Sequence, residues 1–206
     1  MEHFYKNIQG WSDGIVEIYQ HMVSVVPKPE LQFNGSGFVP TTTRQFHFVE
    51  VGTWKGCSAA FMAVEIINSE KNIKFDCVDT WLGSGDEGGH DQDEDVKSGK
   101  LYEKFIESMK PVEGHYNPVR LSSLDAAKLY EDASLDFVFI DAAHDYDNVK
   151  ADILAWLPKV RPGGAIAGHD FNHAPDENGV DYGPGKAVRE LFTDYQTPPY
   201  CWFKIV

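Results

Sequence analysis

The apolar residues of this chain form short runs that alternate with stretches of helical spacing. Strand-forming residues are concentrated in five runs, at 46–51, 73–78, 116–121, 136–140 and 165–168. Apolar residues recur at helical spacing in 58–69, 101–110, 125–130, 145–158 and 185–195. The alternation predicts an α/β fold, a single doubly wound and mostly parallel sheet with helices on both faces. A last run, 200–206, is expected to be an edge strand of either direction.

The beginning of the chain departs from this alternation. Residues 1–26 are predicted to be mostly helical, and Pro27 to end the helix. Residues 27–45 hold several prolines and glycines and are predicted to be a loop. Together they are expected to extend a core, 46–206, within the single domain 1–206.

A strand–turn–helix unit is predicted where the first of the five runs ends. Gly52 and Gly56 follow the strand, and Ser58 is placed to cap the helix. Glycine lets a backbone approach a ligand closely, and a helix amino terminus favours a negative group. Glu50 would accept hydrogen bonds or offset a positive charge. The spacing differs from the G-x-G-x-x-G of dinucleotide enzymes, and a glycine here is also common in doubly wound sheets that bind nothing at it.

Other polar residues follow the strands, where ligands bind in such sheets: Asp79, Ser122, Ser123, Asp141, His144, His169 and Asp170. An acid at Asp79 suits a pair of ribose hydroxyls, and capping a helix or turn is its alternative. Trp81 is placed to flank a flat ring.

Two of these acids follow the fourth and fifth strands. If those strands are neighbours, Asp141 and Asp170 end roughly 5 Å apart and can share one divalent cation such as Mg²⁺. His144, three residues after Asp141, can act as general base on a hydroxyl whose pKa the metal has lowered. In the alternative, Asp141 caps a helix and His144 is a surface histidine.

Residues 83–99 are rich in glycine and charge, and we expect a mobile, lid-like loop. A solvated insertion without a role is the alternative. The aspartates at 91, 93 and 95 have the spacing of the first acidic ligands in a calcium-binding loop. However, Val96 and Tyr102 occupy the positions at which that loop needs Gly and Glu. We therefore exclude such a calcium site.

The composition of the chain limits the classes of molecule that it is expected to bind. With 18 Lys and Arg against 32 Asp and Glu, the net charge of −14 argues against nucleic acid as a partner. The three cysteines lie far apart and indicate reduced thiols in a cytoplasmic protein. We find no apolar run of membrane-spanning length and no signal-peptide pattern, so no membrane partner is expected. The oligomeric state, a homo-oligomer included, is left open.

The chain resembles class I S-adenosylmethionine-dependent methyltransferases over roughly residues 45–195. Its pattern is most similar to that of small metal-dependent O-methyltransferases, a branch with macrocin-type sugar enzymes and, more distantly, the catechol type. Four segments carry the resemblance: Glu50-Val-Gly52-Thr-Trp-Lys-Gly56, Val78-Asp79, Phe139-Ile-Asp141-Ala-Ala-His144-Asp-Tyr146, and Pro162-Gly-Gly164 with His169-Asp170.

The resemblance implies a role for each part of the site. The turn from Gly52 to Ser58 would hold the methionine moiety, Asp79 the ribose, and Ser122 or Ser123 would lie by the adenine. The residues expected to bind the cofactor are Glu50, Gly52, Thr53, Gly56, Ser58, Asp79, Thr80, Trp81, Ser122, Ser123 and Asp141.

The resemblance also implies a metal and a base. Asp141, His169 and Asp170 would hold a divalent cation, Mg²⁺ or Mn²⁺, and His144 would be the catalytic base. His169 replaces a carboxylate of the branch, and Phe171 stands where the catechol type has Asn. Asn172 or His173 is placed to compensate.

We therefore expect an S-adenosylmethionine-dependent O-methyltransferase that acts on a hydroxyl of a small molecule, such as a phenol, a sugar or another secondary metabolite, with help from a divalent metal. A nucleotide-binding oxidoreductase is one alternative, opposed by the missing G-x-G-x-x-G and by the acids after strands four and five. A cofactor-binding module without catalysis is the other.

Overall fold

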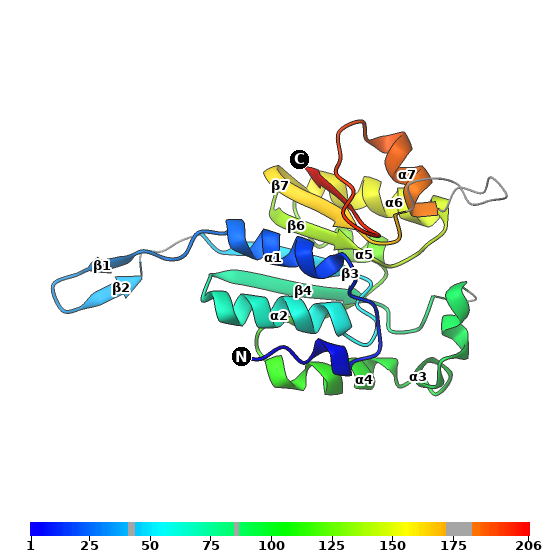
Figure 1. The fold of residues 1–206 in the computed structure, drawn as a ribbon, viewed down its shortest axis with the longest axis horizontal. Helices are drawn as coiled ribbons and strands as arrows, with labels where there is room; N and C mark the ends of the chain where they lie inside the picture. The colour runs from blue at the N-terminus through cyan, green and yellow to red at the C-terminus, as the bar shows by residue number, and fades with distance from the viewer. Residues whose placement is uncertain (41–43, 85–86, 172–182) are drawn as a thin grey trace.

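The computed structural model describes residues 1–40, 44–84, 87–171 and 183–206. Six strands form one sheet in the order β5-β4-β3-β6-β7-β8, in which β8 is antiparallel to β7 and all other neighbours are parallel (Figure 1). The strands are β3 (Phe46–Val51), β4 (Ile73–Asp79), β5 (Asn117–Arg120), β6 (Leu135–Ile140), β7 (Val160–Gly168) and β8 (Trp202–Ile205). The predicted doubly wound, mostly parallel sheet is confirmed.

Helices cover both faces of the sheet, because successive side chains of a strand point to opposite sides. Phe48 on β3 packs in one cluster, beneath helices α1 (Ile15–Val25), α2 (Cys57–Ser69) and α4 (Leu101–Met109). Val49, the next residue, packs in the other, beneath α5 (Ser123–Ala127), α6 (Tyr146–Trp156) and α7 (Gly183–Leu191). Among the described helices, none is long and apolar enough to cross a membrane.

The beginning of the chain is less helical than predicted. Only a short 3-10 turn, Tyr5–Asn7, precedes α1. Gly14, with φ of 75°, directly precedes α1, and a Cβ there would lie 1.9 Å from the Pro199 carbonyl oxygen. This left-handed conformation, which glycine adopts without strain, fixes the start of the helix. Residues 8–14 therefore form an irregular segment instead of the predicted helix.

The predicted loop 27–45 contains a β-hairpin, β1 (Leu31–Phe33) and β2 (Phe38–Pro40), which projects from the body of the molecule (Figure 1). The Asn34 side chain forms its turn, since Oδ1 accepts the backbone N–H groups of Ser36 and Gly37 at 3.0 and 3.1 Å. The composition correctly predicted a turn but did not reveal the strands on either side.

The segment 83–99 is also more regular than predicted. It holds a 3-10 helix, η2 (Glu87–Gln92), and a short α-helix, α3 (Glu94–Lys97). Asp93 caps α3, its carboxylate accepting the backbone N–H of Asp95 at 2.9 Å. Residues 85 and 86 of this segment lie outside the described residues, and its mobility stays a prediction.

A buried carboxylate joins three strands on one face of the sheet. Asp76 on β4 is 1% exposed, and its carboxylate contacts His47 Nε2 at 2.7 Å, Lys74 Nζ at 3.0 Å, the Tyr130 hydroxyl at 3.0 Å and Asn117 Nδ2 at 3.1 Å. Burial alone would raise the pKa of Asp76, but the contacts with His47 and Lys74 lower it to about 2.

We predict that Asp76→Asn lowers the free energy of unfolding by roughly 2 kcal/mol at pH 7. Because the pKa of Asp76 is lowered in the folded state, its contribution is present above the ordinary carboxyl pKa and is lost as pH falls towards about 2. Urea unfolding at several pH values is the measurement. A difference between the two proteins that stays constant from pH 7 to the acid end would contradict the assignment.

Candidate active site

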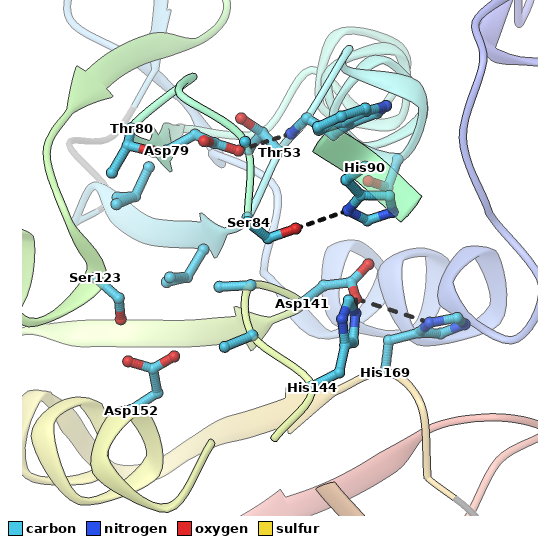
Figure 2. A pocket seen from close by; sticks show the side chains of 18 of the residues that line it. Thr53, Asp79, Thr80, Ser84, His90, Ser123, Asp141, His144, Asp152 and His169 are labelled. Carbon is cyan, nitrogen blue, oxygen red and sulfur yellow. Dashed lines mark hydrogen bonds and ion pairs between the residues drawn. The ribbon is translucent and has the colours of Figure 1, made fainter. Parts of the chain in front are cut away.

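A cavity of about 560 Å³ opens at the carboxyl ends of β3, β4 and β6 (Figure 2). Chain order reverses there, since β4 lies on one side of β3 and β6 on the other, and doubly wound sheets bind ligands at such points. Most of the predicted site residues line this cavity: Gly52, Thr53, Ser58, Asp79, Thr80, Ser122, Ser123, Asp141, His144, His169 and Asp170. Glu50, Gly56 and Trp81 do not.

The turn after β3 is pressed against the end of β6. Gly52 has φ of 90°, and a Cβ on it would lie 2.0 Å from the Asp141 carbonyl oxygen, so no other residue fits. The next residue, Thr53, is 2% exposed and lines the cavity, yet its Oγ1 has no hydrogen-bond partner among the described residues. A buried hydroxyl in that position is available to bond to a ligand or a water molecule in the cavity.

The carboxylate of Asp79 is fixed by backbone groups. Its Oδ2 accepts the N–H of Trp54 at 2.8 Å, and its Oδ1 accepts the N–H of Trp81 at 2.7 Å. Burial raises the pKa of Asp79, and these backbone bonds oppose the rise. Both tryptophans have positive φ, 48° and 52°, which is strained for a bulky residue and is commonest at functional sites.

Glu50 and Trp81, which were predicted to bind the cofactor, do not line the cavity and instead support the turn between β3 and α2. Glu50 is 1% exposed and accepts hydrogen bonds from the Tyr19 hydroxyl at 2.8 Å and from Ser58 Oγ at 2.6 Å. The prediction that Ser58 caps α2 is wrong, because Gly56 occupies the cap position and no side chain caps the helix. Burial raises the pKa of Glu50 to about 8, against the effect of those hydrogen bonds. Trp81 is buried beneath the cavity, its Nε1 donating to the Trp54 carbonyl at 3.0 Å.

Ser123 and Asp152 mark one end of the cavity (Figure 2). Ser123 Oγ accepts a hydrogen bond from Trp156 Nε1 at 2.9 Å. Asp152 is 4% exposed, and burial raises its pKa to about 6 although Ser123 bonds to it. We did not predict Asp152 from the sequence. A signal was available, because it is an acid among the buried residues Val149, Ile153 and Trp156 of α6.

Acids and histidines gather at the other end (Figure 2). Strands β6 and β7 are neighbours, as the metal prediction required. His144 Nε2 lies 3.1 Å from Asp170 Oδ2 and 4.0 Å from Asp141 Oδ1. His169 Nδ1 lies 3.3 and 3.8 Å from the same two oxygens. Asn172 and His173 lie outside the described residues.

This acidic end offers a possible metal site. Asp141, His144 and Asp170 each present a ligand atom within 4.8 Å of the others, although the sequence predicted His169, not His144, as the imidazole ligand. Burial raises the pKa of Asp141 to about 6, an effect that His169 opposes. Oxygen and imidazole ligands suit Mn²⁺ and other transition ions, and the carboxylates also suit Mg²⁺.

Aromatic rings form the remaining wall. The ring of His90 lies 4.7 Å from Trp54, 6.2 Å from Trp11 and 6.1 Å from His144, measured between centroids. Its Nδ1 lies 2.8 Å from Ser84 Oγ. The rings of Trp11 and His90 were not predicted as part of the site, because they come from segments that no sequence motif connects to it.

Comparison with known proteins agrees with this geometry. A family model described as a methyltransferase domain matches residues 49–171, more than half of the chain. An uncharacterized protein, y4gI, of Sinorhizobium fredii is 26% identical over 127 residues, which are 62% of this chain but 13% of that relative. The chain thus spans about an eighth of the length of the curated relative it matches.

Three of the solved structures with similar folds are named as methyltransferases or methylases. The O-methyltransferase NovP has a TM-score of 0.61 at 14% identity, covering 93% of this chain and 79% of its own. CalS11, a TDP-rhamnose 3'-O-methyltransferase, has a TM-score of 0.55 at 14% identity, covering 92% and 76%. A putative rRNA-methylase from Clostridium thermocellum has a TM-score of 0.54 at 10% identity, covering 94% and 96%. At these identities the likeness is one of fold.

The family match covers β3 to β7, the strands whose carboxyl ends build the cavity. The chain therefore belongs to the methyltransferase domain family.

Proposed function

We propose that this methyltransferase acts on a hydroxyl oxygen of a small molecule and that a divalent cation assists it. The observation that carries the proposal is the contact of His144 with Asp170, beside Asp141, at one end of the cavity. A base and two acids at that point match the needs of O-methylation, in which a hydroxyl must lose its proton.

The cofactor would lie along the cavity from Ser123 to the acidic cluster. The unpartnered Thr53 hydroxyl and the close approach at Gly52 fit a ligand held against the turn. Asp79, fixed by two backbone N–H groups, would accept hydrogen bonds from the ribose hydroxyls. Bound S-adenosylmethionine supplies an electrophilic methyl group on a positively charged sulfur.

At the reacting end, His144 takes the acceptor proton. Its Nε2 contacts the Asp170 carboxylate, and a neutral ring that donates its proton to this carboxylate would keep Nδ1 as the basic nitrogen. Asp141 and Asp170 would hold the cation, with His169 Nδ1 nearby, and the cation would lower the pKa of the acceptor hydroxyl. The remaining task of the chain is to align oxygen, methyl group and sulfur.

The acceptor is best described as uncharged and free of phosphate. Among the described residues that line the cavity, four are aspartates and none is Lys or Arg. A nucleotide sugar such as the substrate named for CalS11, or an RNA as in the putative rRNA-methylase, would bring phosphates that this lining does not neutralise. Phenols and sugars without phosphate are therefore the first acceptors to test.

We predict that S-adenosylmethionine and S-adenosylhomocysteine bind in calorimetry and that Asp79→Ala loses roughly 1–3 kcal/mol of affinity. Thr53→Val should lose roughly 1 kcal/mol of affinity while the ligand-free protein becomes no less stable, because the replaced hydroxyl has no protein partner. Asp194→Ala, an exposed change, is the control. Tight binding of NAD(H), with neither of the two sulfur compounds bound, would instead favour an oxidoreductase.

We predict that methyl transfer to a panel of phenols and sugars requires a divalent cation and the His144 base. Asp141→Asn should abolish cation binding and activity together, whereas His144→Ala should spare cation binding and slow turnover about 10²- to 10⁴-fold. Mn²⁺ binding and initial rates are the measurements, with exposed Asp147→Asn as the control. Full activity after exhaustive EDTA treatment would remove the metal from the mechanism, and normal turnover of His144→Ala would remove the base.

We predict that Asp152, a buried carboxylate at the Ser123 end of the cavity, recognises the exocyclic amine of adenine, since Ser123 already bonds to Trp156. Asp152→Asn should reduce the preference for S-adenosylhomocysteine over S-inosylhomocysteine, which carries an oxygen in place of the amine, by about tenfold. It should also stabilise the ligand-free protein at pH 7, because the pKa of Asp152 is raised in the folded state and its charged form is disfavoured. An unchanged preference in Asp152→Asn would contradict this contact between Asp152 and adenine.

A further inference from the structure

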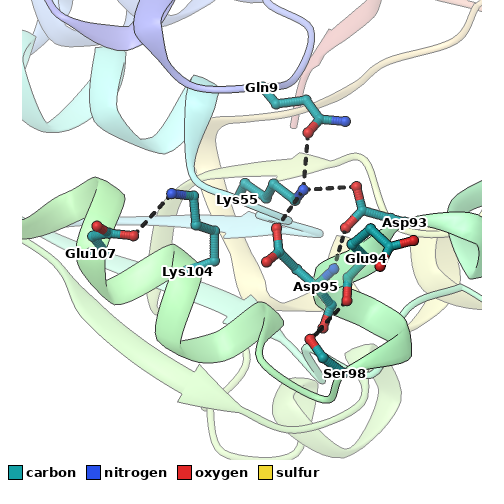
Figure 3. Close-up of polar contacts among 8 residues, drawn as sticks. All are labelled: Gln9, Lys55, Asp93, Glu94, Asp95, Ser98, Lys104 and Glu107. Atoms are coloured by element: carbon teal, nitrogen blue, oxygen red, sulfur yellow. Dashed lines mark hydrogen bonds and ion pairs between the residues drawn. The ribbon is translucent and has the colours of Figure 1, made fainter.

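Lys55, in the turn between Gly52 and Gly56, is 4% exposed and does not line the cavity. Its Nζ lies 2.9 Å from Gln9 Oε1 and 2.7 Å from a carboxylate oxygen of each of Asp93 and Asp95 (Figure 3). An ammonium group has three protons, so these three acceptors use all of its donors. Lysine is rarely buried to this degree, and here its partners account for the burial.

The three acceptors belong to two segments that are far apart in the sequence. Gln9 directly precedes Gly10 and Trp11, which line the cavity. Asp93 and Asp95 lie at the start of α3, immediately after η2 with its His90. Asp93 uses its Oδ1 to cap α3 and its Oδ2 to bind Lys55. One side chain of the cofactor turn therefore fastens both segments.

Each fastened segment contributes a ring to the wall opposite the acidic cluster. Trp11 comes from one and His90 from the other, and Trp54, the residue before Lys55, completes the set that we call the aromatic wall. The ring of His90 also lies 6.1 Å from that of His144. Flat apolar rings beside a base suit an acceptor that carries its hydroxyl on a ring, which stacks on the wall.

We propose that Lys55 is a positioning residue for the acceptor: it holds the aromatic wall of Trp11, Trp54 and His90 in place, so that a ring-shaped acceptor presents its hydroxyl to His144. The inference rests on the proposed function, because it takes His144 as the base. Without the ammonium, the carboxylates of Asp93 and Asp95 would repel one another and both segments would lose their common anchor.

A purely stabilising ion pair is the simpler interpretation, and its consequences differ. Replacing a buried ion pair is often neutral for stability, so buried pairs are weak evidence of a stabilising role. Burial by itself would lower the pKa of Lys55, but the hydrogen bonds that its ammonium donates to Asp93 and Asp95 outweigh this effect and raise the pKa, so the ammonium stays charged at neutral pH. A stabilising pair would affect global unfolding, whereas a positioning residue affects the two segments and the acceptor.

The test compares Lys55→Met with Lys104→Met by hydrogen exchange. Lys104 is the matched control, because its Nζ also bonds a carboxylate, Glu107 Oε2 at 2.9 Å, but on the exposed surface of α4 (Figure 3). In Lys55→Met we expect exchange to rise about tenfold or more in residues 8–13 and 90–97, with the sheet unchanged. Lys104→Met should match the wild type, and Lys55→Arg should restore most of the protection.

Two variants that each change one partner of Lys55 keep the inference testable if Lys55→Met does not fold. Gln9→Leu should loosen only residues 8–13, because it removes one of the three bonds, and Asp95→Asn only residues 90–97, because it removes the charge from another. Carboethoxylation of His90 by diethyl pyrocarbonate reports on the wall itself and should speed up in Asp95→Asn. Unchanged exchange in both segments, or equal loosening of the whole protein, would overturn the proposal.

A final measurement separates this inference from the proposed function. For Lys55→Met we expect the Kd for S-adenosylhomocysteine to stay within about threefold of the wild type, since Lys55 does not line the cavity. The acceptor KM should rise about tenfold or more, with a smaller change in kcat. A wild type that binds no S-adenosylhomocysteine would defeat the proposed function, whereas an unchanged acceptor KM with loosened segments would defeat only the role of Lys55.

Discussion

The site depends on one steric constraint, the close packing of Gly52 against the backbone that leaves β6. A side chain at Gly52 would occupy the place of the Asp141 carbonyl oxygen. Two backbone bonds maintain the contact, since Asp141 donates to the Val51 carbonyl at 2.7 Å and Gly52 to the Val78 carbonyl at 2.8 Å. The parallel register of three strands thus brings the glycine turn after β3 to Asp141, the first acid of the cluster that also contains His144 and Asp170.

The sequence revealed those parts of the site that are local to a strand end. Asp79, Asp141 and Asp170 each follow a buried apolar run, and parallel strands bring their carboxyl ends to one edge. The residues that were missed, such as His90 and Asp152, reach the cavity through packing between distant segments, which no local spacing encodes. The same limit explains one error in the fold, because the tertiary contact between Gly14 and Pro199 decides where α1 begins.

The cavity concentrates negative charge in a buried place. Burial raises the pKa of Asp141 and Asp152, which line the cavity, to about 6, and that of Glu50, which lies behind the turn, to about 8, so the folded chain resists their ionisation. Clusters of this kind cost stability in the ligand-free protein and are retained at functional sites. A positively charged sulfonium and a divalent cation would both stabilise the ionised acids, so the electrostatics of the cavity favour the ligands that we propose.

The position of Lys55 completes this electrostatic argument. As the lysine of the cofactor turn, it has the charge to neutralise the cavity acids, but its ammonium is turned away and saturated by Gln9, Asp93 and Asp95. Had it pointed inward, it would have repelled a cationic cofactor from the very acids that attract it. Directed outward, the same charge bonds to the two segments that carry Trp11 and His90, and the acids that line the cavity face no lysine or arginine among the described lining residues.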